Sequence, residues 1–203
     1  MQEEAKYHIS KISAVINTYN AAEMLERTLD SLKGFDEIVV CDMESTDNTL
    51  IIAQKYGCKI VIFPKGNYNI CEPARNTAIQ AASNEWVLIV DADEVVTSEL
   101  TDYLYQWIEE DNDTSALFVS RKNYFLNKFD SSTYPDYQCR FVKKSCVDWP
   151  ATIHSRPVVD GKCRYIPKNR QELALIHANE RVSPLFSKMC KYTDNEVVRR
   201  YGG

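Results

Sequence analysis

The chain has 203 residues, of which 44% are hydrophobic and 26% charged, and its formal net charge at pH 7 is −5. These values fit one ordinary globular domain with a full core. No apolar run approaches the ~20 residues that span a bilayer, which excludes a transmembrane helix, and the acidic start is unlike a signal peptide. Seven cysteines without a Cys-x-x-Cys pair predict reduced thiols in a cytosolic protein and no zinc site.

Charge is divided unevenly along the chain. Residues 1–113 hold 8 Lys and Arg against 21 Asp and Glu, whereas residues 114–203 hold 16 against 8. The acidic half is suited to a metal cation, and the basic half to an anionic partner such as a phosphorylated glycan or a membrane surface. The alternative is that both halves carry only solvated charges.

Strands and helices alternate through the first half. Apolar runs predict four strands, over residues 12–16, 38–41, 59–63 and 86–90. Apolar residues at helical spacing predict the helices between them, over residues 22–32, 49–56 and 73–82. Asn20 and Glu23 resemble a capping box before the first helix. Continuous Val and Ile runs separated by helices indicate a parallel sheet covered on both faces.

The second half has a different pattern, with aromatic and basic residues interleaved. We expect a helix over residues 97–110, followed by three strands over residues 116–120, 137–142 and 158–166. The tail, residues 184–201, is expected to be a basic amphipathic helix. Such a helix either packs against the domain or contacts anionic lipid at the inner membrane surface.

Two carboxylates, Asp91 and Asp93, follow the strand predicted at residues 86–90. Side chains alternate along a strand, so this spacing points both to one side, where they suit a divalent cation. The alternative is that Asp93 or Thr97 caps the next helix and that Asp91 is a solvated turn residue. Because residues 17–19 and Asp42 also follow strands, they are expected at the same edge of the sheet, which favours a site for a nucleotide and a metal.

Four segments together resemble glycosyltransferase family 2 enzymes of the GT-A fold, at residues 12–20, 37–47, 74–76 and 91–94. Two later segments, 123–126 and 134–141, look like the branch that adds glucose or related sugars to lipooligosaccharide cores. The resemblance implies an α/β fold: a Rossmann-like, mostly parallel sheet with helices on both faces and a mixed α+β acceptor-side half. It implies a single domain over residues 1–203, with a nucleotide-binding half at about 10–110 and an acceptor-binding half at about 111–203.

The resemblance also assigns roles on the nucleotide side. Thr18 and Tyr19 match residues that close over the base, and Asp42 matches the acid that hydrogen-bonds the base. Arg75 matches an Arg that reaches towards the base and diphosphate, and Asp91 the acid at the ribose. The local alternatives are a turn residue for Thr18, a cap for Asp42 and a helix-surface ion pair for Arg75.

On the reaction side, the resemblance implies that Asp93 binds Mn²⁺ or Mg²⁺ and that Asp136 is the base for the acceptor hydroxyl. The alternative for Asp136 is a turn-forming Pro-Asp. His154 is favoured as a further metal ligand, with His177 as the alternative. Relatives commonly have Glu after the His where Ser155 stands, which weakens the assignment of His154.

The implied function is a metal-dependent, inverting transfer of a sugar from a nucleotide-sugar donor, commonly UDP-linked, to a glycan or glycolipid acceptor. Lipopolysaccharide and capsule biosynthesis use such reactions, and no nucleic-acid partner is expected. We expect a cytoplasmic location, with peripheral contact at the membrane face as an addition. The alternatives are a nucleotidyltransferase, which the glycine-free loop at residues 17–22 disfavours, and a non-catalytic module that binds sugar nucleotides. Glu44 stands where relatives have Gly or a small residue, which suggests a different loop shape.

Overall fold

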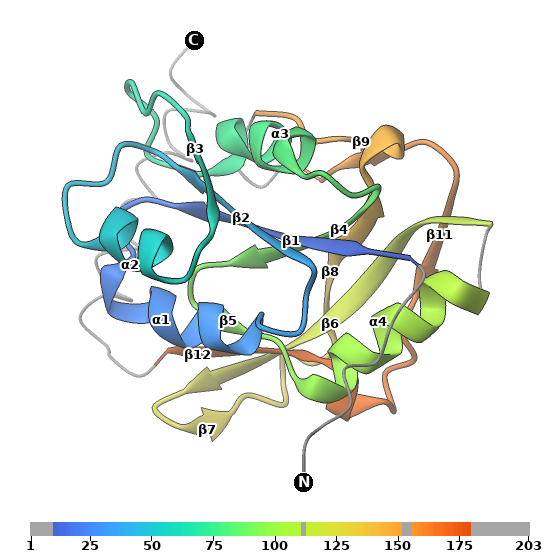
Figure 1. Ribbon diagram of the computed structural model, residues 1–203. Helices are drawn as coiled ribbons and strands as arrows, with labels where there is room; N and C mark the ends of the chain where they lie inside the picture. The colour runs from blue at the N-terminus through green and yellow to red at the C-terminus, as the bar shows by residue number, and fades with distance from the viewer. Residues whose placement is uncertain (1–9, 111–112, 152–155, 180–203) are drawn as a thin grey trace, which may run out of the picture.

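A curled mixed sheet lies between helices in the computed structural model, which describes residues 10–110, 113–151 and 156–179 (Figure 1). The helices are α1 (Ala22–Ser31), α2 (Thr49–Lys55), α3 (Glu72–Ala81) and α4 (Ser98–Glu110), with short 3-10 turns at Lys144–Cys146 and Gln171–Leu173. The strands are β1 (Ile12–Thr18), β2 (Glu37–Asp42), β3 (Lys59–Ile62), β4 (Trp86–Asp91), β5 (Glu94–Val95), β6 (Thr114–Phe125), β7 (Lys128–Phe129), β8 (Asp136–Lys143), β9 (Val147–Asp148), β10 (Val158–Val159), β11 (Lys162–Tyr165) and β12 (Leu175–Asn179).

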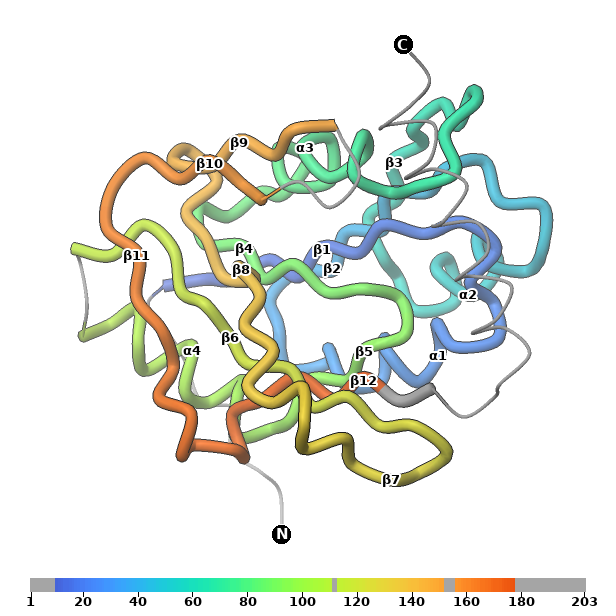
Figure 2. The backbone as a smooth tube through the Cα atoms, turned by 180° about the vertical axis from the view of Figure 1, so that it is seen from behind, coloured from blue at the N-terminus to red at the C-terminus, as the bar shows by residue number. Residues whose placement is uncertain are grey.

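The main sheet has the strand order β3-β2-β1-β4-β8-β6-β12-β5. Its first four strands are parallel, as the sequence predicts. Strand β8 is antiparallel to both β4 and β6, while β12 is parallel to β6 and antiparallel to β5. Figure 2 shows β12 between β6 and β5. The predicted architecture is therefore confirmed, with a parallel first half joined to a mixed second half.

Two hydrophobic cores cover the two faces of the sheet. Helices α1, α2 and α4 pack on one face, where Leu25 and Leu29 meet Ile16; we call this the first core. Helix α3 and strand β9 pack on the other face, where Ala78 meets Val15; we call this the second core. Every residue of β1 is buried, and each fully buried Leu or Ile stabilises the fold by roughly 1.5–3 kcal/mol.

The helix starts in the first half use a different cap from the one predicted. The capping box at Asn20 is wrong, because this residue has a left-handed backbone (φ 49°) and its side-chain oxygen accepts from the amide of Thr46 at 2.8 Å. The carboxylate of Asp47 accepts from the amides of Ala22 (3.1 Å) and Thr49 (2.9 Å). One anion thus serves the positive ends of both α1 and α2.

The second half differs more from the prediction. Strand β6 is longer than expected, and the run at 158–166 divides into β10 and β11 around Gly161, whose φ is 109°. Thr97 does cap α4, because its hydroxyl accepts from the amide of Leu100 at 3.2 Å. The tail predicted at residues 184–201 lies outside the described residues. No helix in the described part of the chain is long and apolar enough to cross a membrane.

Candidate active site

The carboxyl ends of β1, β2 and β4 bring three predicted site residues to one edge of the sheet. Thr18 pairs in register with Asp42, and Asn17 pairs with Asp91 on the other side of β1. Helix α3 packs on the face of the second core and supplies Arg75, whose Nη2 lies 3.0 Å from Asp91 Oδ1. This is the edge at which ligands bind to open α/β sheets.

Asp42 is completely buried and is held by its own chain. The hydroxyl of Thr18 donates to its Oδ1 at 2.7 Å, and the hydroxyl and amide of Ser45 donate to Oδ1 and Oδ2 at 2.6 and 2.8 Å. A carboxylate has about four acceptor positions, so three are used here. Asp42 therefore fixes the loop after β2, in keeping with its alternative role as a cap, and a ligand can reach the fourth position only if this loop moves.

Contacts of Glu44, Lys65 and Tyr19 join the loop after β2 to its neighbours. Glu44 has a left-handed backbone (φ 59°), a conformation that favours glycine. Its carboxylate accepts from the amide of Lys65 at 3.1 Å. The ammonium of Lys65 in turn lies 4.9 Å from the ring centre of Tyr19, which is 47% exposed. Tyr19 thus offers an aromatic face at the edge where the sequence predicts a nucleotide base.

Asp91 is the centre of an ion-pair cluster and is not a solvated turn residue. Both Arg75 and Arg140 donate to its carboxylate. Burial raises the pKa of Asp91, but the charges of Arg140 and Arg75 outweigh burial and hold this pKa well below its usual value. Arg75 is buried and stacks 4.8 Å from the ring centre of Trp149, so it is not a helix-surface ion pair either.

Buried polar atoms without a partner border Asp91. Both side-chain polar atoms of Asn17, and Nε and Nη1 of Arg75, have no hydrogen-bond partner among the described residues. Each of these residues is only 8% exposed. Because buried polar groups are nearly always hydrogen-bonded, these atoms are suited to a polar ligand or to water.

On the other side of the site, Asp93 lies beside His177. The imidazole Nε2 is 3.3 Å from Asp93 Oδ2, and Nδ1 is 2.9 Å from Asn123 Oδ1. Strand β12 makes this contact, because it runs between β6 and β5 and pairs His177 with both Asn123 and Glu94. The geometry favours His177 as the companion of Asp93, whereas His154 lies outside the described residues.

A carboxylate and an imidazole are donors that Mn²⁺ accepts. In the described ranges, no three His, Cys, Asp or Glu groups are gathered closely enough to hold a metal ion alone. Asp93 and His177 therefore fit a cation that takes its remaining ligands from elsewhere. Phosphate oxygens of a bound ligand could supply them.

Asp136 is the first residue of β8 and faces Arg121 across the strand pair. Its Oδ2 accepts from Arg121 (2.7 and 2.9 Å) and Asn123 (3.0 Å), and its Oδ1 accepts from Gln138 (2.7 Å). Burial raises the pKa of Asp136, but the hydrogen bond from Asn123 and the charge of Arg121 more than offset it and lower this pKa. The carboxylate is ionised at neutral pH, and Oδ1, which within the described ranges accepts only from Gln138, has a second acceptor position for a substrate hydroxyl.

Four charged or polar partners of these residues were not predicted: Glu94, Arg121, Asn123 and Arg140. Glu94 and Arg140 are almost wholly buried, with 0% and 3% exposure. All four lie in the segments that carry the family resemblance or directly beside them. Their burial and pairing could not be recognised from the sequence, because the partners are far apart along the chain; Arg140 and Asp91 are 49 residues apart.

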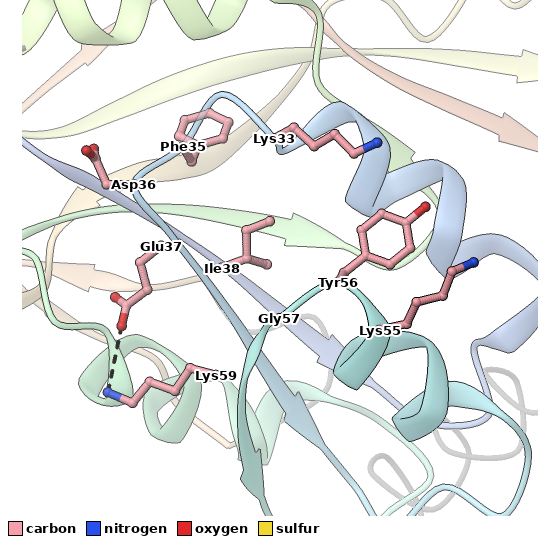
Figure 3. Close-up of a pocket in the computed structure, with 9 residues that line it drawn as sticks. All are labelled: Lys33, Phe35, Asp36, Glu37, Ile38, Lys55, Tyr56, Gly57 and Lys59. Carbon is pink, nitrogen blue, oxygen red and sulfur yellow. Dashed lines mark ion pairs between the residues drawn. The ribbon is translucent and has the colours of Figure 1, made fainter. Parts of the chain in front are cut away.

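A hollow of about 680 Å³ lies at the opposite edge of the sheet, near the amino ends of β2 and β3 (Figure 3). It is lined by Lys33, Phe35, Asp36, Glu37, Ile38, Lys55, Tyr56, Gly57 and Lys59. Its carboxylates are already bound within the chain: Asp36 accepts from the amide of Ile12 at 2.9 Å, and Glu37 from Ser83 at 2.7 Å. No predicted site residue lines this hollow, so its position does not mark the candidate site.

Comparisons with known proteins agree with this geometry. The family model described as glycosyl transferase family 2 matches residues 13–153, and the chain belongs to this family. An uncharacterized glycosyltransferase of Rickettsia bellii is 34% identical over 150 residues, which cover 71% of this chain and 50% of the relative. The Escherichia coli UDP-Glc:alpha-D-GlcNAc-diphosphoundecaprenol beta-1,3-glucosyltransferase WfaP is 29% identical over 125 residues, covering 58% of this chain and 47% of that protein. The chain spans about half the length of these curated relatives.

Solved structures agree on the fold. S. aureus TarS superposes with a TM-score of 0.61 over 83% of this chain and 37% of TarS, at 20% identity. TarS 1–349 in complex with UDP superposes with a TM-score of 0.53 at 29% identity, over 61% of this chain and 39% of that one. The fold is that of the GT-A glycosyltransferases, which confirms the expectation from the sequence.

Proposed function

We propose that the protein is a metal-dependent, inverting glycosyltransferase that moves a sugar from a UDP-sugar to a glycan or glycolipid acceptor. The observation that carries this proposal is the link between the two sides of the site. Asp93, the predicted metal ligand, lies 3.3 Å from His177, which is joined through Asn123 to Asp136, the predicted base. Groups for a leaving diphosphate and for an attacking hydroxyl are therefore next to one another.

The residues suggest a division of labour. Asp42, Thr18 and Tyr19 would hold the base, and Arg75 and Asp91 the ribose and diphosphate. Asp93 and His177 would hold Mn²⁺ or Mg²⁺, which when bound supplies Lewis-acid stabilisation of the leaving diphosphate. These assignments combine the family resemblance with the positions of the side chains at the carboxyl edge.

Asp136 would accept the proton of the acceptor hydroxyl. The acceptor hydroxyl would donate to the second acceptor position of Asp136 Oδ1, and the proton would pass to this oxygen as the hydroxyl oxygen attacks the anomeric carbon. A single displacement of this kind inverts the anomeric configuration. The lowered pKa of Asp136 keeps the carboxylate ionised before the transfer.

The relatives support a glycan or glycolipid acceptor. WfaP is described as acting on a diphosphoundecaprenol-linked sugar, and a relative in Bacillus spizizenii, 34% identical over 117 residues, is described as a poly(ribitol-phosphate) beta-glucosyltransferase. Both names describe acceptors that carry phosphate groups. We accordingly propose a role in cell-envelope polysaccharide synthesis, in the cytoplasm and at the membrane face where a lipid-linked acceptor is presented.

A thermal-shift experiment tests the donor side. A ligand present at 100 times its Kd stabilises the native state by about 2.7 kcal/mol, which raises the melting temperature. UDP is expected to cause this rise only when Mn²⁺ is present, because the proposed cation joins the diphosphate to Asp93. Asp93→Ala is expected to abolish the shift. Asp160→Ala, which removes an exposed carboxylate that is not among the candidate site residues, serves as the matched control. A normal shift in Asp93→Ala would refute the ligand assignment.

A turnover assay separates the candidate functions. Release of UDP from a sugar-nucleotide panel, with the sugar recovered on a glycan acceptor, is the result expected here. Asp93→Ala should reduce this rate about 100-fold or more, since stabilisation of the leaving diphosphate is lost. Pyrophosphate release from a nucleoside triphosphate would instead identify a nucleotidyltransferase, and binding without turnover a non-catalytic module.

A further inference from the structure

Six charged residues form one alternating chain through the site. Its order is Arg75, Asp91, Arg140, Glu94, Arg121 and Asp136. Three arginines and three carboxyl groups alternate, and each inner member lies between two groups of the opposite kind. Burial raises the pKa of Glu94 while the charges of Arg140 and Arg121 act to lower it, so the set is neutral when Glu94 is ionised. Removing one member leaves its neighbours as uncompensated buried charges, which is far more costly than losing a surface pair.

A β-bulge at Arg140 lets this chain pass from one face of the sheet to the other. Strand β6 pairs Leu117 with Phe141 and Phe118 with Cys139, so Arg140 is an additional residue on β8. Phe141 consequently lies in the first core and Cys139 in the second. Bulges of this kind redirect side chains and are frequent beside active sites.

The two ends of the chain belong to different faces. Asp91 contacts Arg75 of α3, on the face of the second core. Arg121 lies two residues beyond Val119 and pairs with Asp136, on the face of the first core. The ladder between β4 and β8 includes only residues 86–88 of β4, and beyond it the contacts between the two strands are made by side chains.

We propose that Glu94 and Arg140 are positioning residues that hold the donor-side carboxylate Asp91 and the acceptor-side carboxylate Asp136 in one arrangement. Arg140 Nη2 lies 2.9 Å from Glu94 Oε1 and also donates to Asp91. Glu94 binds the amide of Asp91 at 3.0 Å and the guanidinium of Arg121 at 3.3 Å. Arg121 then fixes Asp136. This inference rests on the proposed function only for the roles of the two end carboxylates.

The test is a double-mutant cycle between Glu94→Gln and Asp136→Asn. Glu94 does not touch Asp136, so an effect that runs through Arg121 must appear as non-additivity. If Glu94 acts by positioning the base, Glu94→Gln should reduce kcat about 10- to 100-fold, because small misplacements of a catalytic group have effects of this size. The side-chain oxygen of the glutamine can still accept from the amide of Asp91, so the Kd for UDP with Mn²⁺ should change less than twofold. In the Asp136→Asn background, Glu94→Gln should cause no further loss of kcat.

Glu172→Gln is the matched control, since Glu172 forms a surface ion pair with Arg170. It is expected to leave kcat unchanged. Losses in kcat that multiply in the Glu94→Gln, Asp136→Asn double variant would overturn the proposal, because Glu94 would then act independently of Asp136.

The same four proteins give a second readout that requires no turnover. In urea unfolding, each single variant is expected to lower the midpoint. The double variant should lower it by less than the sum of these two decreases, because the two residues are coupled through Arg121. If the wild type releases no UDP, the proposed function fails while this stability cycle still decides the positioning proposal. Additive midpoint shifts would overturn it.

Discussion

Asp42 illustrates how a single side chain links folding to the site. Its carboxylate is fully buried and receives three hydrogen bonds, from Thr18 and Ser45, so it holds the end of β1 against the loop after β2. Hydrogen bonds to a charged group contribute about 1.5–3 kcal/mol each when the partner would otherwise remain unsatisfied. The residue that would bind the nucleotide base therefore also stabilises the loop that surrounds it.

We predict that Asp42→Asn destabilises the protein by about 2–3 kcal/mol, measured by urea unfolding. An amide nitrogen would face donors at one of the two carboxylate positions and lose at least one bond. Ser45→Ala removes a hydroxyl but leaves the Ser45 amide in place, so it should cost only about 1 kcal/mol. Equal effects of the two variants would contradict the view that the carboxylate is the organising group.

For single residues, the sequence predicted where the side chains lie in the sheet better than which side chains they contact. That Thr18, Asp42 and Asp91 share one edge follows from the rule that parallel strands end together. That Asp91 is held by Arg140, or Asp136 by Arg121, depends on which strands of the second half become neighbours. No local pattern encodes that pairing, so buried arginines resemble solvated ones in the sequence.

Among the elements, the parallel strands β1, β2, β3 and β4 were predictable because each is an apolar run bounded by a helix. The strands of the mixed half were less so. Strand β5 has only two residues, and β12 forms where its neighbours β6 and β5 offer pairing partners. Such strands depend on tertiary contacts more than on their own composition.

Gly161, which lies between β10 and β11, has the closest side-chain neighbour of the described glycines. Lys162 pairs with Thr114 and Cys163 with Ala116, so Ser115 is an additional residue on β6. An added Cβ on Gly161 would lie 2.3 Å from the hydroxyl oxygen of Ser115. The left-handed backbone of Gly161, with φ of 109°, adds strain for any other residue.

We predict that Gly161→Ala destabilises the protein by about 3 kcal/mol, from both overlap and backbone strain. Gly57→Ala is the matched control, because Gly57 also has positive φ (69°) but no atom lies within 4 Å of an added Cβ. It should cost only about 1–2 kcal/mol. Both values are measured by urea unfolding followed by circular dichroism, and equal values would show that the contact with Ser115 is unimportant.

For the whole molecule, the buried ion pairs predict a defined response to acid. The folded-state pKa of Asp91 lies well below 3.8, so its ionised form stabilises the native state above the unfolded pKa. That contribution is lost as the pH falls through the lower, folded-state value. The pKa of Asp136 is also lowered, so it acts in the same direction.

We predict that Asp91→Asn lowers the free energy of unfolding at pH 7 by about 3–5 kcal/mol, because Arg75 and Arg140 lose their shared partner. The difference from the wild type should stay constant down to about pH 4 and narrow only at lower pH. Urea unfolding at a series of pH values measures it. A difference that already narrows between pH 7 and pH 5 would contradict the lowered pKa.

The additional residue on β8 has a consequence for how such a molecule could diversify. Because Arg140 is outside the regular pairing with β6, strand β8 places side chains on both faces of the sheet while its pairing with β6 continues on either side of the bulge. The hairpin between Phe125 and Asp136 lies beyond the last rung of this ladder. A change in its length would therefore leave the pairing of β6 with β8, and the arginine that this pairing positions, undisturbed.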